Sequence, residues 1–183
     1  EKELDRLYLS VDRQEYLINW VRREDKRNTV VSAVTTADNT TGYIFASHLN
    51  FDPNLDPAIV EDDAKQAGDE ALQFPYRKYA RLWMEDDYIA AMAASSRSRI
   101  SGDLEKDIAI TYADSEQRQD VESPDQPELS EKLPERGMQV HAEYTLYAHF
   151  MYLHHLFGNV GKIRFFLDQD SGIRAACLAA FQD

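Results

Sequence analysis

Hydrophobic and polar residues alternate along the first part of the chain, as they do in a strand with one buried face. Leu7, Leu9 and Val11 are separated by more polar neighbours, and this period of two residues predicts a strand. Residues 16–21 are apolar again and form either an extension of this strand or a short second one. Residues 29–36 are rich in β-branched side chains and predict the next strand.

A polar turn separates this strand from a third apolar run. Residues 37–42 include Asp38, Asn39 and Gly42, and these residue types favour tight turns and positive φ. Residues 43–49 then predict the returning strand. Three successive strands joined by short polar turns indicate an antiparallel meander.

The pattern changes after Asp52. Residues 57–72 have the composition of a helix, and the acidic residues 61–63 suit its first turn. Residues 76–95 predict a second helix with its large apolar side chains near one side. Residues 114–137 are polar and contain several prolines, which is typical of a loop or a disordered tract.

Regular structure returns at Met138. Residues 140–157 predict a long helix whose four histidines lack the i, i+4 spacing of zinc ligands, and we interpret them as part of an amphipathic helix. Residues 163–167 form an apolar run that predicts a strand buried on both faces. A last helix is expected from Ile173. The expected fold is therefore α/β, with a mixed sheet built from three antiparallel strands followed by helix–strand–helix.

The net charge of −13 argues against nucleic acid as a partner. However, residues 53–137 contain 20 of the 33 acidic side chains and 10 of the 20 Lys and Arg residues. The remainder of the chain has a net charge of only −3, which weakens this objection. The single Cys177 suggests a reducing, cytoplasmic setting. No apolar run is long enough to suggest a membrane partner.

Two aspartates, Asp12 and Asp168, each follow an apolar run that predicts a strand. If these strands are neighbours, both carboxylates project into one crevice at the edge of the sheet. Mg²⁺ and Mn²⁺ favour such oxygen ligands, and two ions held about 4 Å apart stabilise an in-line phosphoryl displacement. Alternatively, each aspartate only opens a turn or caps a helix. Asp170 is a rival for the role of Asp168, although its simpler role is the N-cap of the last helix.

The order of elements and two short segments resemble the DDE transposase and integrase superfamily, which has a ribonuclease H-like core. Residues 34–44 are similar to that family's second and third strands with their turn. Residues 166–176 are similar to the segment around its second catalytic aspartate, especially in mutator-like members. The resemblance covers residues 1–52 and 138–183 and interprets residues 53–137 as an acidic, helical or disordered insertion.

By this resemblance, Asp12 and Asp168 are catalytic and bind Mg²⁺ or Mn²⁺, with Asp170 as a further candidate ligand. The family's third carboxylate has no counterpart before residue 183. We therefore expect a core fragment that is inactive alone.

The function implied by the resemblance is that of a DNA transposase, which cleaves the ends of its element and joins the freed 3′-hydroxyl to target DNA. Its expected partners are these DNA molecules and further copies of the protein. One alternative is a ribonuclease H-like nuclease that acts on RNA–DNA hybrids or junctions. The other is a non-catalytic, acidic interaction module that docks a partner through the predicted helical face Tyr79–Met92.

Overall fold

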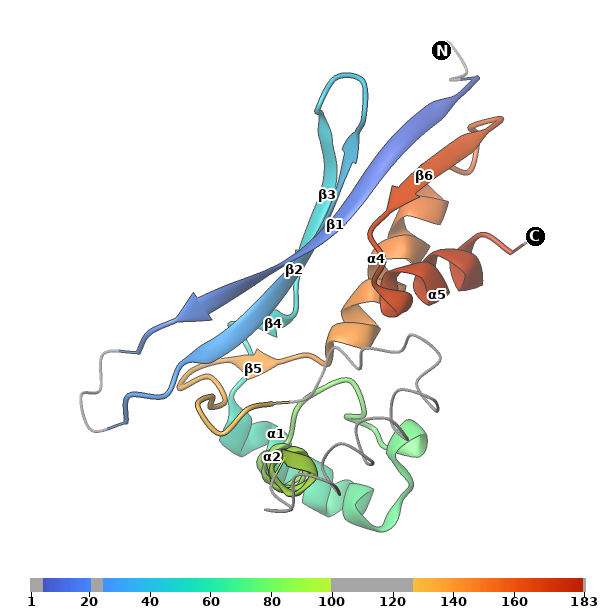
Figure 1. Ribbon diagram of the computed structural model, residues 1–183. Helices are drawn as coiled ribbons and strands as arrows, with labels where there is room; N and C mark the ends of the chain where they lie inside the picture. Colours follow the sequence, from blue (N-terminus) through green and yellow to red (C-terminus); the bar gives the residue numbers. More distant parts are fainter. Residues whose placement is uncertain (1–4, 21–24, 100–126, 183) are drawn as a thin grey trace.

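Four strands form one mixed sheet, β1 (Leu7–Ile18), β2 (Thr29–Asp38), β3 (Ile44–Leu49) and β6 (Ile163–Leu167). The computed structural model describes residues 5–20, 25–99 and 127–182, with only the backbone path for residues 94–99. The strand order is β3-β2-β1-β6 (Figure 1). The first three strands pair antiparallel, and β6 pairs parallel to β1. The predicted mixed α/β class is therefore confirmed.

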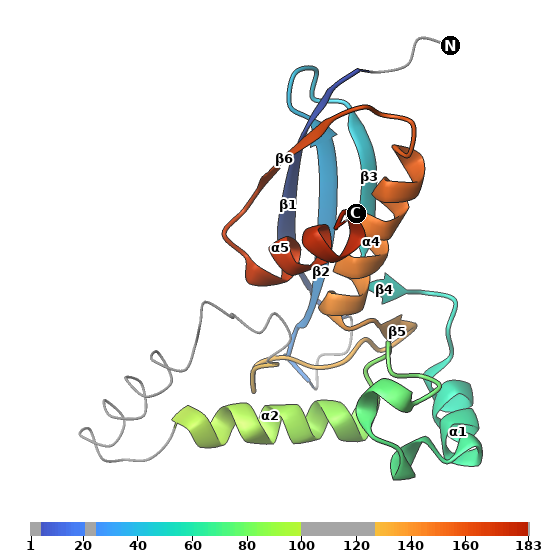
Figure 2. The same ribbon diagram turned by 90° about the vertical axis from the view of Figure 1, so that its right-hand side faces the viewer.

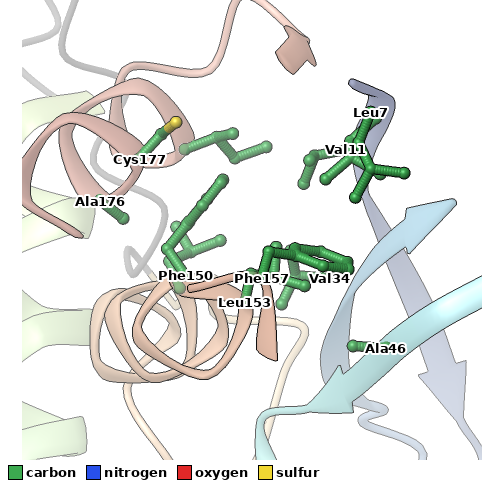
Figure 3. Close-up of a cluster of buried hydrophobic side chains, with 12 residues drawn as sticks. Leu7, Val11, Val34, Ala46, Phe150, Leu153, Phe157, Ala176 and Cys177 are labelled. Carbon is green, nitrogen blue, oxygen red and sulfur yellow. The ribbon is translucent and has the colours of Figure 1, made fainter. Parts of the chain in front are cut away.

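Two helices, α4 (Ala142–Leu156) and α5 (Ser171–Ala180), cover one face of this sheet (Figure 2). Their apolar sides meet the alternate residues of the strands, as the close-up in Figure 3 shows. The buried hydrophobic cluster consists of Leu7, Leu9, Val11, Val34, Ala46, Leu146, Phe150, Leu153, Phe157, Ile173, Ala176 and Cys177. Among the residues that the structure describes, no helix combines the length and the apolar content needed to cross a bilayer.

The first strand is continuous through the polar step in its sequence. Its register with β2 runs unbroken from Leu9 opposite Asp38 to Ile18 opposite Thr29, so the second apolar run extends the same strand. The β2–β3 turn has the predicted chemistry. The Asp38 carboxylate accepts hydrogen bonds from the backbone N–H and the hydroxyl of Thr41, and Gly42 has a φ of 73°.

The last strand has its predicted bounds, but the prediction that both of its faces are buried is wrong. β6 lies at the edge of the sheet, and Arg164 and Phe166 are exposed on the face that no described helix covers. Ile163, Phe165 and Leu167 are partly buried and pack against the hydrophobic cluster. The mostly apolar sequence of the strand did not reveal this difference, because Phe166 is apolar and yet 45% exposed.

The segment between residues 53 and 137 leaves and rejoins the rest of the protein at one place. β4 (Phe51–Asp52) pairs antiparallel with β5 (Met138–Gln139). Gly137 has a φ of 72°, and a Cβ there would lie 2.6 Å from the carbonyl oxygen of Asp52. The close approach therefore requires glycine. The division into a core and an insertion stays a prediction.

Within this segment the structure has α1 (Pro57–Ala67), two short 3₁₀ helices, η1 (Asp69–Ala71) and η2 (Phe74–Tyr76), and α2 (Glu85–Arg99). The side chain of Asp56 caps α1. Because α1 begins at Pro57, the acidic residues 61–63 lie beyond its first turn, and the prediction that placed them there is wrong.

The prediction of one helix over residues 76–95 is also wrong. Leu82 instead pairs with Val140 in an isolated bridge, and the backbone N–H of Trp83 donates to the carbonyl of Gln139 at 2.9 Å. Pairing with a segment distant in sequence therefore overrides the local preference for helix.

Leu82, Trp83 and Tyr88 are buried in the protein itself, which removes much of the face proposed for an interaction module. Of the predicted loop 114–137, residues 114–126 lie outside the described residues.

Candidate metal site

The parallel pairing of β1 and β6 brings Asp12 and Asp168 next to each other. The last paired positions of these strands are Val11 and Leu167, and each aspartate is the next residue along its chain. Neighbouring strands lie about 4.8 Å apart, so the two backbones are close where the carboxylates begin. The sequence suggested that Asp12 ends its strand. It does not, because β1 continues to Ile18.

Side-chain alternation places Asp12 on the open face of the sheet. Leu9 and Val11 are buried under the helices, so the side chain of Asp12 leaves β1 on the opposite face. Asp168 follows Leu167, the last residue of β6, and therefore lies at the start of the turn after this strand. Both aspartates are exposed. The arrangement is an exposed carboxylate on β1 beside an exposed carboxylate just after β6, open to solvent and to a large substrate.

Neither carboxylate is neutralised within the described part of the chain. Asp12 accepts only a long hydrogen bond from the Gln14 amide, at 3.4 Å. The Oδ1 atom of Asp168 accepts from the backbone N–H of Gln169 at 2.7 Å. No Lys or Arg of the described residues forms an ion pair with either of them. Like charges held close together repel, and a divalent cation between them offsets that repulsion.

The third candidate ligand, Asp170, has a structural role. Its Oδ1 atom accepts from the backbone N–H groups of Gly172 at 2.7 Å and Ile173 at 3.2 Å, so it is the N-cap of α5. Its Oδ2 atom lies 3.3 Å from Nε of Arg13. Both oxygens therefore have protein partners, and the capping role accounts for Asp170 at this position.

The donor set fits a hard divalent cation that keeps part of its hydration shell. Mg²⁺ is usually held by one or two carboxylates, with water and substrate phosphates completing its octahedron. Asp12 and Asp168 provide that number. Over residues 5–20, 25–99 and 127–182, no group of three or more His, Cys, Asp or Glu side chains is placed to hold a metal ion.

Described residues around α1 and α2 line cavities elsewhere in the protein. One, of about 560 Å³, is lined by Trp83, Tyr88 and Lys132 among others. Another, of about 250 Å³, is lined by Phe74 and Arg77 among others. Neither is lined by the paired aspartates.

Sequence reasoning missed a buried polar cluster on the other face of the sheet. His149 of α4 is fully buried. Its Nε2 atom lies 2.7 Å from Oγ1 of Thr36, and its Nδ1 atom lies 2.8 Å from Nδ1 of His48. Burial, together with the neighbouring His48, lowers the pKa of His149 to about 4. The sequence could have predicted the burial of His149, because it shares the buried side of the helix with Leu146 and Leu153 at spacings of three and four.

No family model matches the chain, and comparison with curated proteins and with solved structures found no significant match.

Proposed function

We propose that this protein contributes the first two metal ligands of a DNA transposase core, Asp12 and Asp168, which act with Mg²⁺ or Mn²⁺. The observation that carries the proposal is the register of β1 and β6, in which Val11 pairs with Leu167. Two carboxylates from distant parts of the chain follow these paired positions and have no basic partner among the described residues. Turn formation alone does not require that juxtaposition.

The topology supports a ribonuclease H-like assignment for the core. Three antiparallel strands are followed by α4, by β6 parallel to the first strand, and by α5. The parallel strand is added beside β1, on the edge opposite β3. β1 and β6, the first and the last strand of this sheet in the sequence, are therefore neighbours, and a site can form between them.

The chemistry proposed is the displacement of a DNA phosphodiester, first by water and then by the freed 3′-hydroxyl. Bound divalent ions polarise the phosphate and stabilise the attacking and leaving oxygens. Asp12 holds its position through the β1 ladder, and Asp168 through its hydrogen bond to the Gln169 backbone. The exposed face leaves room for a strand of DNA.

The placement of charge is compatible with DNA as the partner. The acidic segment contributes α1 and α2, which lie beyond one end of the sheet (Figure 1). The repulsion between these two helices and DNA is thus separated in space from the paired aspartates and is screened by salt over about 10 Å. We also propose self-association on DNA and a cytoplasmic setting, consistent with a buried, free Cys177.

Calorimetric titration with Mn²⁺ tests the proposal. The Asp12→Asn and Asp168→Asn variants keep the size of each side chain and remove its charge. Each should weaken Mn²⁺ binding by at least about tenfold, because the loss of even a supporting hydrogen bond at a metal site costs about 10–100-fold. The matched control is Asp62→Asn, which changes an exposed carboxylate of α1 that accepts from Gln66. Equal binding by all four proteins would refute the site.

A second assay tests whether this chain has a complete catalytic site. Because the described residues offer only two carboxylates at the site, we expect metal binding without strand transfer by this chain alone. Incubation with DNA and Mn²⁺ should leave the strands intact. Cleavage that disappears in Asp12→Ala would show that the chain is catalytically complete and would contradict this expectation.

A further inference from the structure

Arg13 connects β1, the strand of Asp12, with the turn that carries Asp168. It follows Asp12 on β1, so its side chain leaves the strand on the opposite face, under α5. There its Nε atom lies 3.3 Å from Oδ2 of Asp170. The side chains of Arg13 and Asp170 are only 16% and 12% exposed. An ion pair so well shielded from water holds its geometry better than an exposed one.

Asp170 is the main carboxylate partner of this guanidinium. Glu15 lies farther away, at 3.8 Å from Nη2, and its side chain is 59% exposed. The Nη1 atom is buried and has no acceptor among the described residues. Arg13 is therefore anchored chiefly through Asp170, and Asp170 is in turn fixed to α5 by its two capping hydrogen bonds.

The turn that carries Asp168 is not held by strand pairing, because β6 ends at Leu167. It is held instead by side-chain contacts. Arg174 donates to the carbonyl of Gln169 at 3.0 Å, and Arg13 binds Asp170. Of these two contacts, only that of Arg13 ties the turn to β1, the strand of Asp12.

We propose that Arg13 is a positioning residue that, through Asp170, fixes the spacing between Asp12 and Asp168. This inference rests on the proposed metal site. Its chemical consequence is selectivity among divalent cations. Mg²⁺ demands near-ideal octahedral geometry at about 2.0–2.1 Å, whereas Ca²⁺ accepts irregular coordination at about 2.3–2.6 Å. A fixed spacing between the two aspartates favours Mg²⁺. If the turn is no longer held by Arg13, that preference is lost.

Three variants separate this role from folding. Arg13→Gln removes the charge, and Arg13→Lys keeps it. Asp170→Asn removes the ion pair but keeps the helix cap, since Asn and Asp cap helices about equally well. Arg81→Gln, at an exposed position outside the sheet, is the matched control. Circular dichroism at the titration temperature confirms that each variant is folded.

The titrations use Mg²⁺ and Ca²⁺ separately. We expect Arg13→Gln and Asp170→Asn each to weaken Mg²⁺ binding by about tenfold and to leave Ca²⁺ binding within about threefold. Arg13→Lys should recover most of the Mg²⁺ affinity. The double variant Arg13→Gln/Asp170→Asn should lose no more than either single variant, because both break the same contact.

The outcomes distinguish the inference from the function on which it rests. If Mg²⁺ binding by the unaltered protein does not depend on Asp12 and Asp168, both the positioning role and the proposed metal site are refuted. If it does bind, but the Arg13 and Asp170 variants keep its Mg²⁺ affinity or lose Mg²⁺ and Ca²⁺ affinity equally, the positioning role is refuted and the metal site stands.

Discussion

Replacing His149 should change how the stability of this protein depends on pH. His149 is fully buried between Thr36 and His48, and its pKa in the folded protein is lowered to about 4 from 6.5. Between these values the unfolded chain binds a proton that the folded protein does not. The contribution of neutral His149 is therefore complete above pH 6.5 and is lost as the pH falls toward 4.

The size of the effect follows from the two pKa values. One pKa unit corresponds to about 1.4 kcal/mol, so the whole contribution is about 3 kcal/mol. Between pH 7.5 and pH 5, linkage gives a loss of about 2 kcal/mol from this residue. His149 has no solvent exposure, so screening by water does not reduce the figure much.

Urea denaturation at pH 7.5 and at pH 5 measures the free energy of unfolding for the protein and for His149→Gln, which cannot titrate. The variant should lose about 2 kcal/mol less than the unaltered protein over this interval. The comparison cancels other groups, including Glu131, whose pKa burial raises. His155→Gln, an exposed position on the same helix, is the control. An equal pH dependence in His149→Gln and the unaltered protein would refute the reasoning.

Three further predictions concern packing and reactivity. Phe150→Ala, at a side chain with no exposed area, should lower the free energy of unfolding by about 3–5 kcal/mol in urea denaturation; a loss below about 1 kcal/mol would contradict the core assignment. Gly137→Ala should destabilise more than Gly68→Ala in thermal melting, because both have positive φ but only at position 137 does a Cβ meet neighbouring atoms within 4 Å. Burial raises the pKa of Cys177 to about 11, so an aromatic disulfide reagent at pH 8 should label it only after unfolding; rapid labelling of the folded protein would contradict this.

The sheet could be predicted from the sequence because its signals are local. Alternation identified β1, and turn chemistry at Asp38 and Gly42 identified the β2–β3 hairpin. The bounds of β6 followed from a run that is apolar except for Arg164. Each of these features depends on residues close together in the chain, and tertiary contacts only reinforce them.

The features that could not be predicted from the sequence depend on contacts between residues distant in the chain. Residues 81–83 pair with residues 139–141, which no local pattern predicts. Phe166 is exposed because it lies on the face of the sheet that no described helix covers. At the candidate site, the sequence supplied Asp12 and Asp168, but it did not show that Arg13 occupies the second oxygen of Asp170, because that contact crosses more than 150 residues.

Nuclear magnetic resonance with Mn²⁺ tests the central claim most directly, since a bound paramagnetic ion broadens the amide signals nearest to it. In isotope-labelled protein, substoichiometric Mn²⁺ should first broaden the amides of residues 11–13 and 167–169. The same signals should stay sharp in Asp12→Asn and in Asp168→Asn. Broadening confined to the acidic helices α1 and α2, with Asp12 and Asp168 unaffected, would contradict the claim that these two aspartates share a cation.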